Sequence, residues 1–336
     1  MTDVGQIKKL LNDPAHAVDE LVASAVVAHG GLLVAPEPRV VARAVPGSPG
    51  KVGVSLGGGS GHEPAFLGYV GPGLADSAAI GNVFAAPSPD VVLASIMAAD
   101  HGAGVLLVYG NYNGDVMNTR LASKRAKASG VDVRSLFTTD DVASAPPTER
   151  DRRRGIAGEV FVFKIAGAAA ESGMPIDEVE RVANKANDRL GSMGVALSGA
   201  EIPGASRPIF ESPAGQMEIG LGVHGEPGVR SAPLGPAAEV AQVLVETIIE
   251  DLGIVSGDRV AVLVNGLGAT SLLEQYVVHG SVVELLGKLG VVVERSYVGE
   301  YVTSLQMAGV SVSLMCLDDE LLGLLDAPAR SVGWTS

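Results

Sequence analysis

Two glycine-rich segments, each built around a histidine, constrain the fold of this chain more than any other feature. The first is GGGSGHEP at residues 57–64, and the second is GVHGEPG at residues 222–228. The first follows a strand-like run at 51–56, and the second ends an alternating stretch at 217–223. This pattern predicts strands that deliver His62 and His224 into tight loops. Two such loops suggest one shared site built from both halves of the chain.

The length and composition predict two α/β domains. The chain has 336 residues, of which 47% are hydrophobic, enough for an extensive core. Only 4% are aromatic while 44 are glycine, a composition typical of helices packed closely on sheets. We expect an N-terminal α/β domain at residues 1–190 and a C-terminal α/β domain at 191–336, each with a central sheet flanked by helices.

Charge and cysteine content exclude several classes of protein. The formal net charge of -14 argues against nucleic-acid binding, which needs a basic surface. The basic run Arg150–Arg154 is interpreted as a solvated surface. No run of about 18 apolar residues is present, so we expect no membrane association and a cytoplasmic location. The single cysteine, Cys316, leaves no partner for an intrachain disulfide.

The periodicity of apolar residues predicts the following elements. Helices are expected at residues 18–26, 91–99, 116–129, 158–172, 176–190, 237–252, 272–289 and 318–325. Strands are expected at 51–56, 104–109, 131–137, 195–197, 216–223, 259–265, 291–296 and 310–316. The Gly/Ala/Pro-rich passage 68–89 is expected to be a structured loop with short pieces.

Asp115 ends the loop between the strand expected at 104–109 and the helix expected at 116–129. In an open parallel sheet, such a loop lies at the carboxyl ends of the strands, where ligands usually bind. Asp115 is therefore placed for chemistry. An aspartate that opens a helix can also serve only as its N-cap.

The glycine-rich motifs match neither a phosphate loop nor a dinucleotide-binding fingerprint. The first glycine run lacks the Lys-Ser/Thr of a phosphate loop, and it also lacks the third glycine of a dinucleotide fingerprint. Imidazole and carboxylate side chains can bind several divalent metal ions. The candidate residues here lack the close sequence spacing of a metal site, so no metal is expected at His62, Glu63, Asp115, His224 and Glu226. A glycine-framed neutral imidazole can instead act as nucleophile or general acid and base.

Seven motifs in order resemble the dihydroxyacetone kinase family, specifically its substrate-binding K subunit. The resemblance extends from about residue 15 to the C-terminus and is carried by GGGSGHEPAFLGYVGPG, GNVFAAPSPD, NYNGDVMN, GVALSG, GLGVHGEPG, VNGLGATS and LLGLLDAPA. It implies a homodimer of two-domain α/β subunits that binds a short ketose.

The resemblance also implies roles for individual residues. The residue matching His224 forms a covalent hemiaminal with the ketose carbonyl through Nε2. The residue matching Asp115 acts as base on the hydroxyl that accepts phosphate, and His62 hydrogen-bonds the substrate and assists proton transfer. The remaining substrate contacts are expected from small residues: Gly59, Ser60, Gly110 and Gly114. Close approach of the ligand would account for glycine at position 59.

No cofactor is expected in this chain, because family members take their phosphoryl donor from a helical L subunit. That subunit carries ATP, or tightly held ADP, with magnesium. The 336 residues leave no room for such a domain, so the chain is expected to bind substrate and to depend on an L partner for phosphorylation. Free ATP and recharging through a phosphotransferase-system M subunit both stay open as the source of phosphate.

One position departs from the family pattern. The family commonly has lysine just before the Asn-Tyr of the Asp115 loop, and here that residue is Gly110. Loss of a cation and gain of volume suggest a ketose longer than dihydroxyacetone, such as the tetrulose erythrulose. A non-catalytic ketose-binding co-regulator is the main alternative function. An unrelated metal-dependent sugar enzyme is the third.

Overall fold

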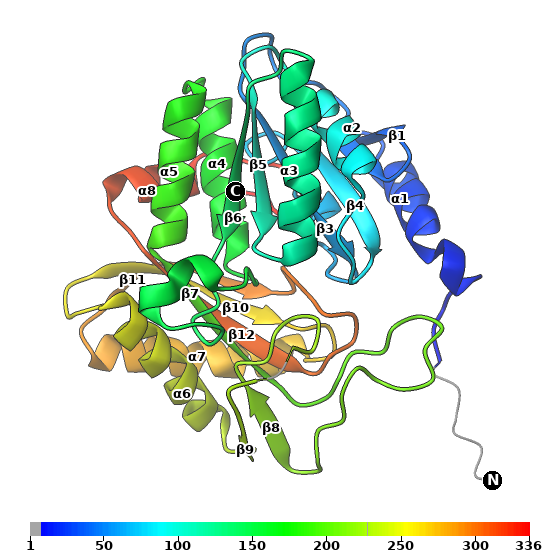
Figure 1. Ribbon diagram of the computed structural model, residues 1–336. Coiled ribbons are helices and arrows are strands. Elements are labelled where there is room, and N and C mark those ends of the chain that lie inside the picture. Colours follow the sequence, from blue (N-terminus) through cyan, green and yellow to red (C-terminus); the bar gives the residue numbers. More distant parts are fainter. Residues whose placement is uncertain (1–7, 227) are drawn as a thin grey trace.

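The computed structural model describes residues 8–226 and 228–336, which form two six-stranded sheets with helices packed against them (Figure 1). The predicted fold class is confirmed. The first sheet lies in the upper half of Figure 1 and the second in the lower half. Helices cover the sheets, and the buried helix between the two sheets shares an apolar core with both of them.

The first sheet has the strand order β1-β2-β4-β3-β5-β6. Its strands are β1 (Leu33–Glu37), β2 (Val40–Arg43), β3 (Gly53–Ser60), β4 (Ser77–Val83), β5 (Val105–Gly110) and β6 (Val133–Thr138). The pairs β4–β3, β3–β5 and β5–β6 are parallel, whereas β1 and β2 add an antiparallel edge. The carboxyl ends of the four parallel strands therefore meet along one edge, where ligands bind in such sheets.

Helices cover both faces of the first sheet. α2 (Pro89–Ala99) and α3 (Asn113–Ala128) share one apolar cluster with β5. α1 (Ala17–Ala28), α4 (Glu159–Glu171) and α5 (Ile176–Asp188) belong to the cluster on the other face. α4 is buried along almost its whole length because the sheet, α5 and α8 (Asp319–Asp326) surround it.

The second sheet has the order β11-β10-β12-β7-β8-β9. Its elements are β7 (Leu190–Ala196), β8 (Gln216–Ile219), β9 (Arg230–Pro233), α6 (Ala237–Leu252), β10 (Arg259–Gly266), α7 (Leu272–Lys288), β11 (Val292–Gly299) and β12 (Gly309–Cys316). Successive side chains of β10 point to opposite faces of the sheet, so the strand contributes to a core on each face. Val262 packs under α6 and α7, while Ala261 and Leu263 join the core that contains α4.

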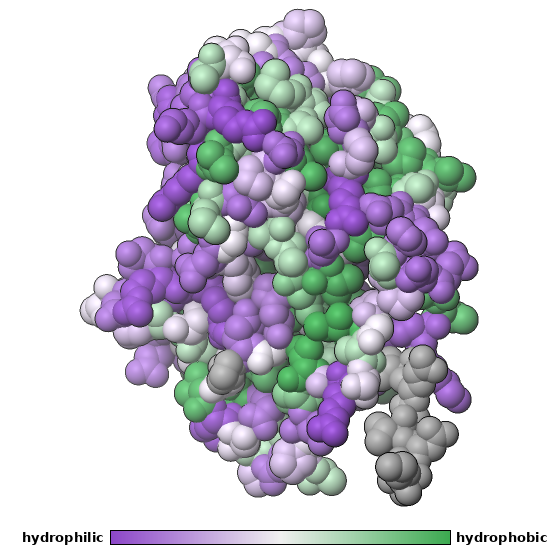
Figure 2. All heavy atoms as spheres, turned by 45° about the vertical axis from the view of Figure 1, so that its right-hand side comes forward, coloured by the Kyte–Doolittle hydropathy of each residue, from purple (hydrophilic) through white to green (hydrophobic). Residues whose placement is uncertain are grey.

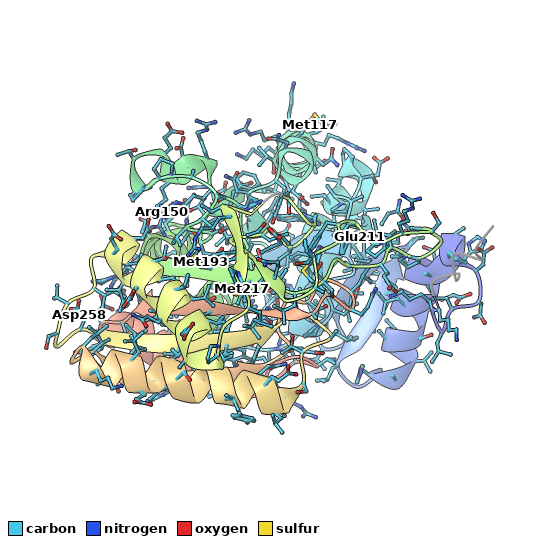
Figure 3. All side chains as sticks on the ribbon, turned by 90° about the horizontal axis from the view of Figure 1, so that it is seen from below. Met117, Arg150, Met193, Glu211, Met217 and Asp258 are labelled. Atoms are coloured by element: carbon cyan, nitrogen blue, oxygen red, sulfur yellow. The ribbon has the colours of Figure 1, made fainter. Side chains whose placement is uncertain are left out.

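Two methionines belong to the apolar core between the second sheet and α6. Met193 from β7 and Met217 from β8 belong to the apolar cluster that also contains α6, and both are labelled in the view from below (Figure 3). Both are largely buried. The flexible thioether side chain suits such a position between a sheet and a crossing helix.

Several local predictions were wrong. The passage 68–89 contains β4, a central strand of small residues. It is buried between β2 and β3, so it shows no polar alternation that could reveal it. Strands β1, β2 and β9 were also missed. The basic run 150–154 is only partly a solvated surface, because Arg152 is exposed whereas Arg153 is fully buried and donates to Asp251 through both terminal guanidinium nitrogens.

The chain passes from the first sheet to the second between β6 and β7. The helices α4 and α5, which lie between these strands in sequence, pack with the first sheet, and β7 begins at Leu190. The C-terminal helix α8 then returns to pack on α4. A division into domains at residues 190 and 191 stays a prediction.

The molecular surface is mixed in character. In the view of Figure 2, hydrophilic and hydrophobic residues are interspersed over the whole face. Within the described ranges, no helix combines the length and apolar character needed to cross a membrane.

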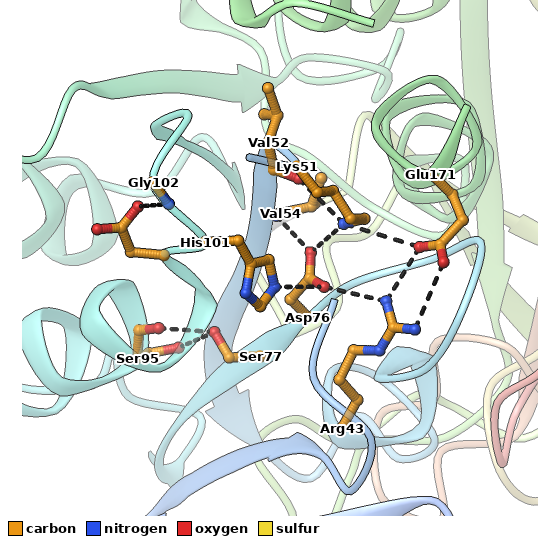
Figure 4. A network of polar contacts seen from close by, with 11 residues as sticks. Arg43, Lys51, Val52, Val54, Asp76, Ser77, Ser95, His101, Gly102 and Glu171 are labelled. Carbon is orange, nitrogen blue, oxygen red and sulfur yellow. Dashed lines mark hydrogen bonds and ion pairs between the residues drawn. The ribbon is translucent and has the colours of Figure 1, made fainter. Parts of the chain in front are cut away.

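A buried ionic cluster holds the amino-terminal end of the first sheet (Figure 4). Asp76, which is completely buried, accepts hydrogen bonds from Lys51 Nζ at 2.6 Å, Arg43 Nη1 at 3.1 Å and the Val54 amide at 2.9 Å. His101 Nε2 lies 3.1 Å from the same carboxylate. Burial alone would raise the pKa of Asp76, but these partners together hold it below its ordinary value.

Replacing Asp76 with asparagine is expected to lower the free energy of unfolding by about 3–5 kcal/mol, because the buried Arg43 and Lys51 lose their buried countercharge and keep only the partly exposed Glu171. Urea denaturation at pH 7 measures the loss. Since the folded pKa is depressed, this stabilisation is present above the unfolded pKa and is lost as the pH falls through the folded pKa. The control is Asp90→Asn, whose exposed pair with Arg125 should be worth under about 1 kcal/mol. Equal losses in both variants would contradict the prediction.

Candidate functional site

A pocket lies where the carboxyl ends of β3 and β5 approach loops of the second sheet. It has an empty volume of about 350 Å³, including its open mouth. Its walls are Gly57, Gly58, Gly59, His62, Phe66, Gly110, Tyr112, Asp115, Gly155, Glu159, Val223, His224 and Val302. Both glycine-framed histidines and Asp115 therefore line one pocket, as the two motifs predicted.

The two histidines lie side by side in the pocket wall and contact each other. His62 Nε2 and His224 Nε2 are 3.0 Å apart, and the two rings meet edge to face. His62 is buried and stacks on Phe84, and its Nδ1 lies 2.7 Å from the Thr303 carbonyl oxygen. Because a carbonyl only accepts, Nδ1 of His62 carries a proton and donates it. Burial, together with the charge of His224, lowers the pKa of His62 to about 3, so this ring is neutral and its Nε2 accepts.

Glu226 orients the His224 ring. Its Oε1 lies 3.0 Å from His224 Nδ1, and its Oε2 accepts the His224 backbone amide at 3.0 Å. Arg154 lies 3.8 Å from the same carboxylate and also pairs with Asp141. Burial raises the pKa of Glu226, but the hydrogen bond and charge of His224 outweigh it and lower the pKa to about 2. The ionised carboxylate thus holds Nδ1 as a donor and leaves Nε2 directed at the pocket.

Asp115 lies in the first turn of α3, which begins at Asn113 and not at residue 116. The aspartate is therefore inside the helix, and its side chain is free of the N-cap role. Its Oδ1 is buried and has no hydrogen-bond partner among the described residues. Burial raises the pKa of Asp115 to about 7, opposed by the charge of His224. A carboxyl group with this pKa can gain and lose a proton near neutral pH, as a general base must.

The glycines of the first motif are required by packing. They belong to β3 itself, although the sequence predicted a loop there. A Cβ on Gly58 would lie 2.2 Å from the Phe66 ring, and one on Gly59 would lie 2.7 Å from the Ala85 amide nitrogen. Gly59 lines the pocket as predicted, but neighbouring backbone explains the glycine there without any ligand.

The remaining predicted substrate contacts divide into two groups. Gly110 lines the pocket, whereas Ser60 and Gly114 do not. The Ser60 hydroxyl donates to the Gly81 carbonyl within the sheet. The space beside Gly110 is not open, because a Cβ there would meet the Tyr112 ring at 3.0 Å.

Two pocket residues were missed by the sequence analysis. Tyr112 lies in the predicted loop, and its ring packs edge to face on His224 while its hydroxyl donates to the Gly155 carbonyl. Glu159 lies in the helix expected at 158–172, for which the sequence predicted no functional residue. The available signal was a lone acid in the apolar run 155–163. Over residues 8–226 and 228–336, no cluster of three or more His, Cys, Asp or Glu is arranged to hold a metal ion.

Comparison with known proteins shows the family of the chain. Residues 23–333 match the Dak1 domain. The chain belongs to the Dak1 family. One relative is the dihydroxyacetone-binding subunit DhaK of a PTS-dependent dihydroxyacetone kinase from Listeria innocua. The two sequences are 44% identical over 330 residues, and the aligned region covers 98% of this chain and 100% of the relative. The predicted kinship with K subunits is thereby confirmed.

Other Dak1 relatives differ in length and role. The chain is 46% identical to an L-erythrulose 1-kinase of Mycolicibacterium smegmatis over 326 residues, which is 96% of this chain but 57% of the kinase. A solved dihydroxyacetone kinase operon co-activator superposes with a TM-score of 0.89 at 31% identity, covering 94% of this chain and 98% of that one. Both kinases and a co-activator therefore share this fold.

Proposed function

We propose that the chain is the ketose-binding component of a dihydroxyacetone-type kinase, which holds a short ketose on His224 and presents its hydroxyl for phosphorylation. The observation that carries the proposal is the convergence of His224 Nε2, His62 Nε2 and Asp115 on one pocket. A carbonyl trap, a proton acceptor and a base are the three groups that this chemistry needs.

The two imidazoles supply a balanced route to a hemiaminal. A hydrogen bond between the two Nε2 atoms needs one proton, and neutral His62 can only accept at Nε2, so that proton belongs to His224. We propose that His62 takes it as His224 Nε2 bonds to the ketose C2. The carbonyl π bond breaks, and its oxygen receives the same proton from His62. The His224 ring stays protonated at Nδ1 and cationic beside Glu226.

Asp115 then acts on a terminal hydroxyl of the tethered ketose. Its free Oδ1 accepts the hydroxyl proton as the oxygen attacks the transferred phosphoryl group. The phosphate comes from ATP, or from ADP recharged by a phosphotransferase-system M subunit, held with magnesium on an L-type partner. The full-length match to a protein named as a dihydroxyacetone-binding subunit supports this division of labour. A homodimer and a cytoplasmic location are further parts of the proposal.

The substrate range is proposed to include the tetrulose erythrulose as well as dihydroxyacetone. Glycine at position 110 places no charge in the pocket, and relatives named as erythrulose kinases are 45–46% identical to this chain. The neighbouring Tyr112 ring, however, occupies the space that a side chain at position 110 would enter. A longer ketose therefore gains no room at the place where that side chain would stand.

Native mass spectrometry with dihydroxyacetone, D-erythrulose, L-erythrulose and glycerol tests the proposal. We expect each ketose to add its whole mass without loss of water, and glycerol to add nothing because it has no carbonyl. Adding an L-type subunit with ATP and magnesium should then yield ketose phosphate. Unchanged mass with every ketose would refute the proposal.

A non-catalytic co-regulator is the second candidate, favoured by the close superposition on a co-activator. A sensor needs the carbonyl trap but has no use for a base. Asp115, buried in the pocket with a free oxygen, favours the kinase component. Ketose adducts without any phosphate product after addition of the L-type subunit would instead favour the co-regulator.

A further inference from the structure

Glu159 is a buried acid in the pocket for which the proposed reaction gives no task. Glu159 belongs to the first turn of α4 and is only 3% exposed to solvent. It lines the pocket together with Gly110 and Gly155. Among the described residues, no Lys, Arg or His nitrogen lies within 4 Å of its carboxyl oxygens. Burying a carboxyl group without a countercharge costs free energy, and hydrogen bonds to that group offset the cost.

The surroundings of Glu159 favour its neutral form. Burial raises the pKa of Glu159 well above its ordinary value, and the nearby carboxylates Asp140 and Asp115 act in the same direction. Thr138 Oγ1 lies 3.1 Å from Glu159 Oε2 and 3.3 Å from the Tyr109 carbonyl oxygen. One threonine proton cannot serve both acceptors. A protonated Oε2 resolves this, because it donates to Thr138, which then donates to Tyr109.

This arrangement leaves Glu159 Oε1 for the pocket. Among the described residues no group donates to Oε1, and the carboxyl group borders the pocket next to Gly110, where a Cβ would lie 3.6 Å from Oε2. Tyr112 closes the neighbouring space and is fixed by its own hydrogen bond to the Gly155 carbonyl. A ligand hydroxyl can therefore reach the carboxyl group of Glu159 without displacing a side chain.

We propose that Glu159 is a specificity-determining residue that hydrogen-bonds the hydroxyl on the fourth carbon of a tetrulose. The inference rests on the proposed function, which assigns the carbonyl carbon to His224 and one terminal hydroxyl to Asp115. With those two contacts fixed, the pocket wall offers two polar side chains that the reaction does not use, Tyr112 and Glu159, and the Tyr112 hydroxyl already donates to the Gly155 carbonyl. Dihydroxyacetone has no fourth carbon and does not need this contact.

Titration calorimetry on Glu159→Leu and Glu159→Gln tests the inference with three ligands: L-erythrulose, its 4-deoxy analogue and dihydroxyacetone. Loss of one hydrogen bond is expected to weaken L-erythrulose binding to the leucine variant about tenfold, with the other two ligands unchanged. Glutamine is neutral and of the same shape, so it should retain L-erythrulose binding to within about threefold. The ratio of affinities is the readout, because general damage to the pocket would weaken all three ligands together.

The outcomes separate this inference from the function on which it rests. If wild-type protein forms ketose adducts but Glu159→Leu leaves the ratio of L-erythrulose to dihydroxyacetone affinity unchanged, Glu159 has no such role. The same conclusion follows if all three ligands weaken equally. If the wild-type protein binds no ketose at all, the proposed function and this inference both fail. Should the leucine variant not fold, loss of L-erythrulose selectivity in Glu159→Gln would by itself overturn the inference.

Discussion

Replacing His224 with alanine is expected to abolish the covalent ketose adduct, because no other nucleophile in the pocket has the geometry of its Nε2. That atom is directed inward by Glu226 and lies 3.0 Å from the one imidazole that can take its proton. His62 cannot replace it, since burial holds the pKa of His62 near 3 and its Nδ1 is committed to the Thr303 carbonyl. Native mass spectrometry with dihydroxyacetone should show unmodified protein only.

Two further variants make this result specific. His16→Ala removes an exposed histidine before α1 and should leave the adduct at the wild-type level. Glu226→Gln keeps the shape of the orienting group but removes its charge beside the cationic ring. It should slow adduct formation without abolishing it. An adduct of wild-type yield in His224→Ala would assign the nucleophile to another residue.

The sequence predicted that His62, His224 and Asp115 share one site. Two of them reach it from the same edge of the first sheet, whereas His224 reaches it from the loop after β8 in the second sheet. Asp115 follows a buried parallel strand, and His62 follows its neighbour in the sheet. Periodicity was enough to find β5, β10 and the long helices. The loop that carries His224 was placed by its glycines and by the resemblance to a known family, not by any contact visible in the sequence.

Other features depend on contacts between residues far apart in the chain. β4 escaped prediction because its small residues are buried on both faces. Arg153 looked like part of a surface cluster, yet Asp251, 98 residues away, holds it inside. Glu159 stood in a predicted helix without any assigned role, and only its position beside Gly110 and Gly155 reveals it as part of the pocket wall. Tertiary packing decides each of these cases, and local pattern cannot report it.

Replacing Asp115 with asparagine is expected to lower turnover with an L-type subunit and ATP by about 10²- to 10⁴-fold, the range for loss of a general base. The adduct should survive, since tethering depends on the two histidines. The fold should survive too, because the replaced carboxylate is buried with Oδ1 unpartnered and the neutral amide is cheaper to bury. Asp90→Asn, an exposed change at the start of α2, should alter neither adduct nor turnover.

The pH dependence of turnover distinguishes loss of a base from loss of position. Burial raises the pKa of Asp115 to about 7, so the carboxyl group is mostly protonated below that pH and cannot accept a proton from the ketose. Wild-type turnover should therefore rise as the pH increases through about 7. The residual turnover of Asp115→Asn should lack this rise, because the amide does not titrate. A rise of the same midpoint and size in the variant would show that another group is the base, and it would leave Asp115 as a residue that only positions the substrate hydroxyl.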